Sequence, residues 1–154
     1  MIPILEKHKN AFGDILEEVT TDSGYCSEKN LLYLKQNKIS SYIKLQDHEK
    51  RKIRAYTEDI GKYYNMKTQI FEDELYYVCH DGRELHHIRT EKKEQSGYTQ
   101  TFEVYGCADC SGCGHKAKCL YKYNAEKDAE KNKVMKINEQ WEVLKRRIPC
   151  KYTK

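Results

Sequence analysis

The chain has 154 residues, of which 38% are hydrophobic and 34% are charged. These values fit one globular domain, or part of a domain with an insertion, and exclude an intrinsically disordered chain. The net charge of +4 is too small to predict a nucleic-acid partner by itself. The sequence has no apolar run that could span a bilayer and no secretory signal, so we expect a cytoplasmic protein with no membrane partner.

The N-terminal part predicts a helix followed by a strand–helix–strand unit. Residues 2–12 have the amphipathic pattern of a short helix, and Gly13 is placed to end it. Residues 15–21 and 39–45 are typical of strands, and Ser27 is suited to cap the helix between them. Two strands joined by a helix normally pair in parallel with a right-handed crossover, so we expect an α/β fold.

The middle of the chain changes to a β pattern. Residues 47–68 are charged and weakly periodic, which is typical of a connector with some helix. Three runs, at residues 70–78, 85–90 and 98–105, are β-like. The pair Asp81–Gly82 between the first two is a hairpin turn signal.

The C-terminal part is polar, with one predicted helix. Residues 124–134 have no apolar face and predict a surface linker or a frayed helix. Asn138 can cap a helix that carries Trp141 and Leu144, and Pro149 would end it. Basic runs at Lys44–Arg54 and before Pro149 normally form a solvated surface, and contact with DNA phosphates is the alternative.

Seven cysteines are present, and five of them form a pattern: Cys79, Cys107, Cys110, Cys113 and Cys119. In a reducing cytoplasm, clustered thiols bind metal more often than they form disulfides. Zinc takes four thiolate or imidazole ligands in a tetrahedron, and C-x2-C spacing on a tight turn puts two sulfurs on one ion. Gly112 and Gly114 would let the backbone curl around the metal.

We predict a structural zinc site with four ligands: Cys79, Cys110, Cys113 and Cys119. Cys107 is the alternative ligand and His115 a weaker one. A complete thiolate shell leaves no position for substrate, and the chain has no HExxH motif, so a zinc hydrolase is disfavoured. Thiols buried without metal are the competing interpretation, and Cys26 and Cys150 are interpreted as ordinary thiols.

Asp22 is the candidate catalytic residue. It follows the first predicted strand, and in open α/β sheets the chemistry gathers at the carboxyl ends of strands. Phosphoryl-transfer sites need two or more carboxylates to hold paired metal ions. By spacing alone, an aspartate before Ser23–Gly24 is more often a turn residue that accepts a hydrogen bond from its own backbone.

The block at residues 19–31, VTTDSGYCSEKNL, strongly resembles the "ADSGYGSEENL" block of insertion-sequence DDE transposases. Residues 43–51 look like the strand and basic segment that follow in that family. Cys79-x-x-Gly82, then Tyr105 and the cysteine cluster, look like the zinc-type insertion of one branch. The similarity covers residues 4–145, although Gly114 stands where the family often has proline.

The resemblance implies a ribonuclease H-like catalytic domain in which Asp22 is the second carboxylate of the DDE triad. In an intact relative, three carboxylates bind two Mg²⁺ ions and cleave and transfer strands of DNA at transposon ends. The first aspartate is expected before Met1 and the glutamate after Lys154. The chain is therefore expected to be a fragment, truncated at both ends and inactive alone.

This interpretation divides the chain into four segments. Residues 1–46 are a partial ribonuclease H-like core, 47–69 a charged connector, 70–122 a zinc-binding β insertion, and 123–154 a polar linker with a helix that returns to the core. An intact transposase is a candidate oligomer partner. The alternative is a free-standing zinc-stabilised module that binds nucleic acid or protein, for which the Tyr, Lys and Arg side chains of residues 42–64 are suited.

Overall fold

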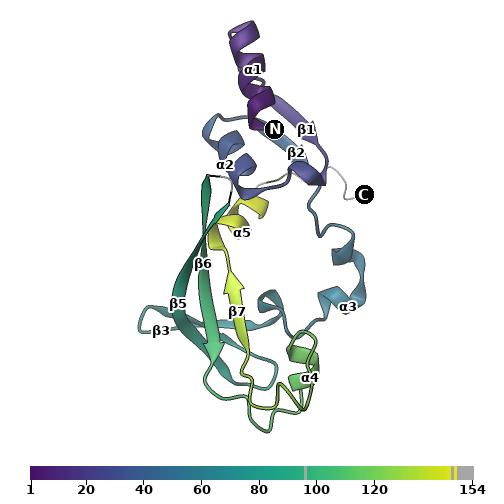
Figure 1. Cartoon of the computed structure of the whole chain (residues 1–154), viewed down its shortest axis with the longest axis vertical. Helices are drawn as coiled ribbons and strands as arrows, with labels where there is room; N and C mark the ends of the chain where they lie inside the picture. The colour runs from purple at the N-terminus through teal and green to yellow at the C-terminus, as the bar shows by residue number, and fades with distance from the viewer. Residues whose placement is uncertain (96, 147, 149–154) are drawn as a thin grey trace. The chain divides into compact units, whose positions relative to one another are not determined.

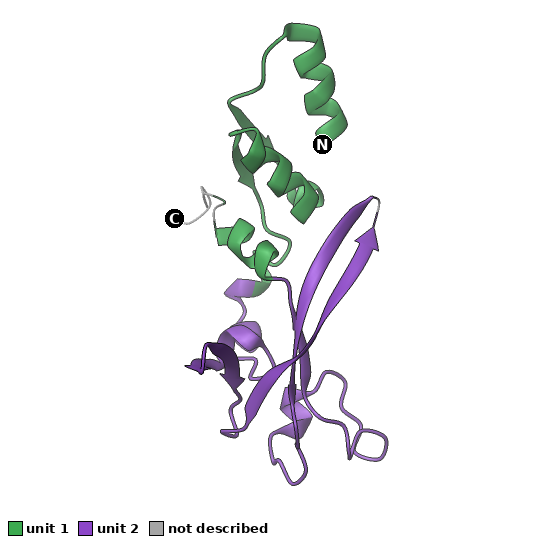
Figure 2. Ribbon diagram, turned by 90° about the vertical axis from the view of Figure 1, so that its left-hand side faces the viewer, with its two compact units in different colours: residues 1–50, 139–154 green, residues 51–138 purple. Residues whose placement is uncertain are grey.

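The computed structural model describes residues 1–95, 97–146 and 148, and the chain divides into two compact units (Figure 2). Unit 1 consists of Met1–Lys50 with the C-terminal segment from Glu139, and unit 2 of Arg51–Asn138. Unit 1 contains a two-stranded parallel sheet and unit 2 a five-stranded antiparallel sheet. The predicted mixed α/β class is therefore confirmed. None of the described helices is long and apolar enough to cross a membrane.

Unit 1 has the predicted order of a helix followed by a βαβ unit (Figure 1). Its elements are α1 (Ile2–Phe12), β1 (Glu18–Thr21), η1 (Ser23–Tyr25), α2 (Glu28–Gln36), β2 (Ser40–Ile43) and α5 (Glu139–Arg146). α1 ends at Gly13, which adopts a left-handed φ of 70° that glycine reaches without strain. Ser27 Oγ accepts a hydrogen bond from Asn30 N at 3.3 Å, so the predicted helix cap is formed.

The core of unit 1 is a cluster of apolar side chains that the helix and strand periodicities bring together. Leu31 and Leu34 lie one turn apart on the inner face of α2, as predicted. The buried members are Leu5, Cys26, Leu31, Leu34, Ile39, Ile43 and Leu144. Each fully buried leucine or isoleucine stabilises the fold by roughly 1.5–3 kcal/mol through removal from water. The predicted helix stop at Pro149 and the thiol of Cys150 lie outside the described residues.

Unit 2 is built on the antiparallel sheet, with strand order β3-β4-β5-β6-β7. Its strands are β3 (Lys67–Phe71), β4 (Glu74–Val78), β5 (Glu84–Gln95), β6 (Tyr98–Cys107) and β7 (Val134–Ile137). Its helical segments are η2 (Lys50–Lys52, which begins at the last residue of unit 1), α3 (Arg54–Thr57), η3 (Tyr63–Asn65) and α4 (Lys116–Cys119). The connector at residues 47–68 contains short helices, as the sequence predicts.

Two details of unit 2 differ from the sequence prediction. The run at residues 70–78 is not one strand, because Glu72 and Asp73 adopt positive φ angles of 49° and 66° and turn β3 back on β4. The polar segment predicted as a linker ends in β7, which pairs with β6. On β7, Met135 and Ile137 are buried and alternate with exposed residues. The strand forms because its backbone N–H and C=O groups bond to β6, a contact that the local sequence does not indicate.

The core of unit 2 is rich in tyrosine, methionine and cysteine. Its buried members are Met66, Tyr77, Leu85, Tyr105, Cys107, Cys110, Met135 and Ile137. The Tyr77 and Tyr105 rings meet edge to face with their centroids 4.9 Å apart, a favoured aromatic geometry. Leu85 is completely buried and lies opposite Cys107 in the β5–β6 register. The apolar core therefore continues directly into the cysteine segment.

Candidate metal centre

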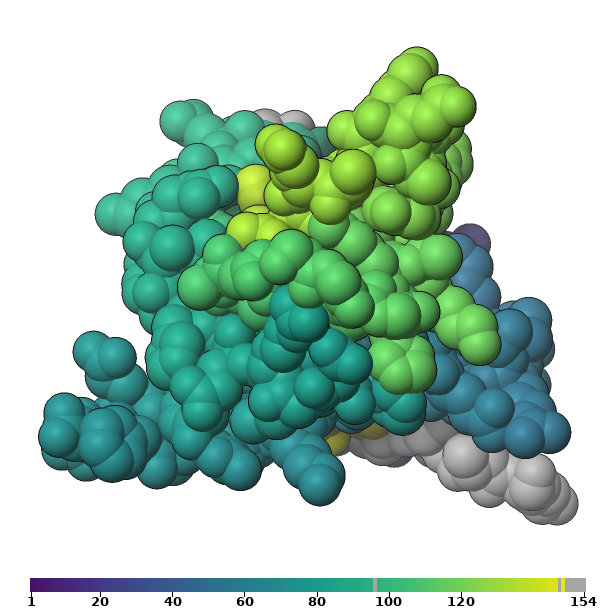
Figure 3. All heavy atoms as spheres, turned by 90° about the horizontal axis from the view of Figure 1, so that it is seen from below, coloured from purple at the N-terminus to yellow at the C-terminus, as the bar shows by residue number. Residues whose placement is uncertain are grey.

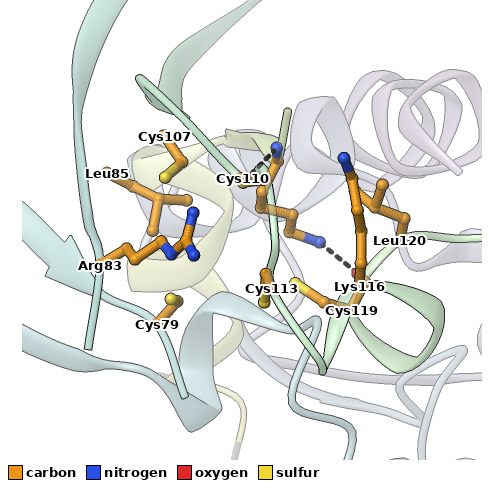
Figure 4. A pocket seen from close by; sticks show the side chains of 10 residues that line it. Cys79, Arg83, Leu85, Cys107, Cys110, Cys113, Lys116, Cys119 and Leu120 are labelled. Carbon is orange, nitrogen blue, oxygen red and sulfur yellow. Dashed lines mark hydrogen bonds between the residues drawn. The ribbon is translucent and has the colours of Figure 1, made fainter. Parts of the chain in front are cut away.

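The five patterned cysteines of unit 2 converge on one small cavity (Figure 4). The cavity volume is about 20 Å³, which is enough for a single water-sized particle. The cavity is lined by the side chains of Cys79, Cys107, Cys110, Cys113 and Cys119. Three cationic residues, Arg83, Lys116 and Lys133, and two leucines complete its wall.

Separate elements deliver these cysteines. Cys79 follows β4, Cys107 ends β6, and Cys119 ends the short helix α4. Cys110 and Cys113 lie in the loop between β6 and α4. In the view from below, the teal atoms around residues 79–83 lie against the green atoms of the segment 107–120 (Figure 3). Residues more than twenty positions apart in the sequence thus meet around one cavity.

The Cys79 loop is a tight turn. Cys79 N donates to Arg83 O at 2.9 Å, and Gly82 N donates to Cys79 O at 3.0 Å. Gly82 has a φ of 79°, a conformation that L side chains rarely adopt. The Asp81–Gly82 turn signal therefore corresponds to the loop that orients Cys79.

The loop after Cys107 is held by its own side chains. The Asp109 carboxylate accepts hydrogen bonds from Ser111 N at 2.8 Å and from Ser111 Oγ at 2.7 Å. The bond from Ser111 N is the main cause that lowers the pKa of Asp109. Gly112 adopts a φ of 63°, and Cys113 N donates to Cys110 O at 3.4 Å. The backbone thus curls between Cys110 and Cys113, as the glycine spacing predicts.

Arg83 ties the two loops together. Its Nη1 donates to Asp109 O at 2.8 Å and its Nη2 to Ser111 O at 2.9 Å. Its Nε donates to Asp81 Oδ2 at 2.9 Å, inside the Cys79 loop. The planar guanidinium presents several donors in fixed directions, so a single side chain can fix the position of one loop against the other.

Asn132 and Lys133, immediately before β7, form a second set of hydrogen bonds to the cysteine segment. Asn132 Oδ1 accepts from Cys110 N at 2.9 Å, and its Nδ2 donates to Ala108 O at 2.7 Å. Lys133 N donates to Cys110 Sγ at 3.3 Å, and Lys133 Nζ donates to Cys119 O at 2.9 Å. The sequence analysis missed these roles, because neither residue shows periodicity or a motif.

The thiols influence one another electrostatically. Burial raises the pKa of Cys107 to about 11, and the neighbouring Cys110 thiol adds to this effect. Burial also raises the pKa of Cys119, and the Lys133 ammonium opposes that change. The remaining contributions to the raised pKa of Cys119 come from the thiols of Cys79, Cys110 and Cys113. Cys119 therefore lies close to the other three members of the predicted ligand set.

Cys107 differs from the rest. Its Sγ donates a hydrogen bond to Asp109 O at 3.2 Å, so the proton has a fixed acceptor. In Figure 4 its side chain lies beside Leu85, whereas Cys113 and Cys119 lie next to each other. Across residues 1–95, 97–146 and 148, no three His, Cys, Asp or Glu side chains are arranged so that they could hold a metal ion. The thiols thus line the cavity without closing on a common point. His115 contacts His80 with ring centroids 4.7 Å apart and does not line the cavity.

Asp22, the candidate catalytic residue, lies in unit 1 directly after β1. Its Oδ1 accepts a hydrogen bond from Gly24 N at 2.9 Å, the turn arrangement that spacing alone favours. The side chain is exposed, and within the described part of the chain no group of three metal-ligating side chains surrounds it.

Comparison of the chain with models of protein families, with curated proteins and with solved structures found no match.

Proposed function

We propose that this chain is part of a DDE transposase, in which unit 1 belongs to the ribonuclease H-like catalytic domain and unit 2 is a zinc-stabilised β module. Two observations support the proposal: in unit 2 five cysteines gather around one cavity, and in unit 1 the Asp22 block has βαβ order. The transposase assignment itself rests on the resemblance of residues 19–31 to the family's motif.

The donor set fits zinc. Thiolates are soft ligands, and zinc takes four of them at about 2.3 Å. A four-thiolate zinc site carries a net charge of −2, and the cations of Arg83, Lys116 and Lys133 in the cavity wall would offset it. In the folded unit, hydrogen bonds from Arg83 and Asn132 fasten the loops, so the sulfur atoms need only small movements to reach one ion.

The ligands in this proposal are the four predicted cysteines: Cys79, Cys110, Cys113 and Cys119. Cys107 is left out of this set because its Sγ donates a hydrogen bond to Asp109 O at 3.2 Å. A complete shell leaves no open position for water or substrate, so the metal has a structural role. Structural zinc contributes on the order of 10–16 kcal/mol to the folding of zinc-finger peptides.

Asp22 would supply one carboxylate of the triad. Mg²⁺ requires near-octahedral oxygen ligands and usually keeps several waters, so one exposed carboxylate binds it weakly. DNA cleavage would therefore need the other two carboxylates of the family on neighbouring segments. When both metal ions are bound, they activate the attacking oxygen and stabilise the leaving oxygen. Asp22, fixed by Gly24 N at the end of β1, would hold its ligand oxygen in position.

The proposal is tested by reading the DNA that flanks this reading frame in all frames. We expect an aspartate-bearing strand upstream and a glutamate-bearing helix downstream. A protein joined from these segments should cleave DNA carrying the element's ends in a Mg²⁺-dependent way. Asp22→Asn should abolish cleavage without changing the zinc content. Cleavage that survives Asp22→Asn, or flanking DNA that encodes neither carboxylate, would contradict the proposal.

A free-standing module that binds nucleic acid is the second candidate, and one observation favours it. Tyr64 is 44% exposed and contacts Tyr56 with ring centroids 5.8 Å apart, close in sequence to Arg51 and Lys52. Exposed aromatic rings beside basic residues suit base stacking and phosphate contact. Fluorescence anisotropy with a single-stranded oligonucleotide should then show affinity that falls steeply with salt and that Tyr64→Ala weakens. Salt-independent or absent binding excludes this candidate.

A further inference from the structure

One residue outside the cysteine pattern contacts three of the five cavity cysteines. Lys133 N donates to Cys110 Sγ at 3.3 Å, and Lys133 O accepts from Cys107 N at 2.9 Å. Lys133 also lines the cavity, and its Nζ donates to Cys119 O at 2.9 Å. The backbone and the ammonium of Lys133 therefore act on different cysteines at the same time.

The Lys133 ammonium is held in place by a second carbonyl. Nζ also donates to Gly61 O at 2.7 Å. Gly61 lies so close to the end of α4 that a Cβ atom on Gly61 would be 2.5 Å from Cys119 O. The absence of a side chain at Gly61 thus lets two carbonyl groups meet at one ammonium. Both acceptors are neutral carbonyl groups, so these two hydrogen bonds leave the positive charge of Lys133 in place beside the thiols.

We propose that Lys133 is the positioning residue of the thiolate site. Its backbone N–H fixes the Cys110 sulfur, and its ammonium offsets part of the negative charge that four thiolates leave on a bound divalent metal. The inference rests on the proposed zinc site. A hydrogen bond to an ionised sulfur is stronger than one to a neutral thiol, so the contact favours the metal-bound state.

The test compares zinc affinity of the whole chain and three variants by competition with a chromophoric chelator. Lys133→Met removes the charge and keeps the aliphatic stem, and Lys133→Arg keeps the charge. Lys118→Met is the matched control, because Lys118 is an exposed lysine of α4 that does not line the cavity. We expect Lys133→Met to weaken zinc binding about 10–100-fold, the usual range for residues that support metal ligands. Lys133→Arg should recover most of this loss, and Lys118→Met should bind zinc like the wild type.

A second readout separates the charge from a purely structural role. In the Co²⁺-loaded chain, loss of a cation beside the sulfurs should shift the sulfur-to-cobalt charge-transfer band to lower energy in Lys133→Met and leave it in place in Lys133→Arg. A Lys133→Met chain with unchanged zinc affinity and an unshifted band overturns the role of Lys133 and leaves the zinc site standing. A wild-type chain that binds neither zinc nor cobalt overturns the zinc site, and the inference with it.

Discussion

The two units of this chain reach a folded state by different means. Unit 1 buries leucine and isoleucine side chains from helices and strands whose periodicity is visible in the sequence. Unit 2 combines a core of tyrosine, methionine and cysteine with loops held by side-chain hydrogen bonds from Arg83, Asn132 and Lys133. The first kind of core is built mainly from aliphatic side chains, whereas the second contains several polar and ionisable groups that need partners. A bound metal would supply such a partner for the thiols.

The largest expected effect is that of metal removal, which should unfold the loops of unit 2 and leave unit 1 folded. Zinc chelation, or Cys113→Ser, should unfold the loops of unit 2, because zinc contributes on the order of 10 kcal/mol in comparable small sites. Unit 1 should keep its slow amide exchange, since its core contains no predicted ligand. Hydrogen exchange measured by mass spectrometry with and without chelator reports both units in one experiment. Equal loss of protection in both units would contradict the difference drawn between them.

A substitution that leaves a cavity in the core of unit 1 should destabilise unit 1 and leave metal binding by unit 2 unchanged. Leu34 is 1% exposed on the inner face of α2, and Leu34→Ala should cost about 2–5 kcal/mol of unfolding free energy. Denaturant unfolding followed by circular dichroism measures this loss. Leu32→Ala, on a less buried position of the same helix, is the control and should cost less. A Leu34→Ala chain that also loses its metal would show that the two units are not independent.

Gly61→Ala tests whether the packing of unit 2 and its zinc affinity depend on each other. The new Cβ would be 2.5 Å from Cys119 O, so the backbone must shift, at a cost of roughly 1–3 kcal/mol. Because Cys119 is a proposed ligand, zinc affinity should fall together with stability. Gly97→Ala is a suitable control, since its Cβ meets nothing within 4 Å and any strain comes from its positive φ alone. Isothermal titration with zinc should find Gly97→Ala unchanged in affinity; equal losses in both variants would rule out the packing explanation.

The smallest expected effect is that of the helix cap in unit 1. Ser27→Ala removes the acceptor for Asn30 N and should destabilise α2 by about 1 kcal/mol. Ser27→Asp should restore most of this stability, because an aspartate also caps a helix and interacts favourably with its dipole. Thermal unfolding of the zinc-loaded chain measures the change, and a neutral Ser27→Ala variant would show that the cap contributes nothing.

The same contrast explains how much of the structure the sequence could predict. In unit 1, the helix end at Gly13, the cap at Ser27 and the spacing of Leu31 and Leu34 are visible within a few residues, so local patterns indicate α1, α2 and the strands. In unit 2, the turn at Glu72–Asp73 lacks the glycine that usually marks a hairpin turn, so its sequence signal is weak.

Contacts distant in sequence were the hardest to predict. β7 is a four-residue strand whose partner, β6, begins more than thirty positions earlier. The five cysteines of the sequence pattern line one cavity, because sulfur clusters leave a sequence signal, and the zinc site itself stays a prediction. The cations that surround them leave none, since Arg83 and Lys133 resemble any other basic residue until the loops are in place.

The most direct test of the account is the metal content of the intact chain, measured by native mass spectrometry after purification without added metal or chelator. We predict one zinc ion per chain, retained in Cys107→Ser and lost in Cys119→Ser. A wild-type chain without zinc that also takes none up when zinc is added, or a Cys119→Ser chain that binds zinc as tightly as the wild type, would contradict the proposed metal centre.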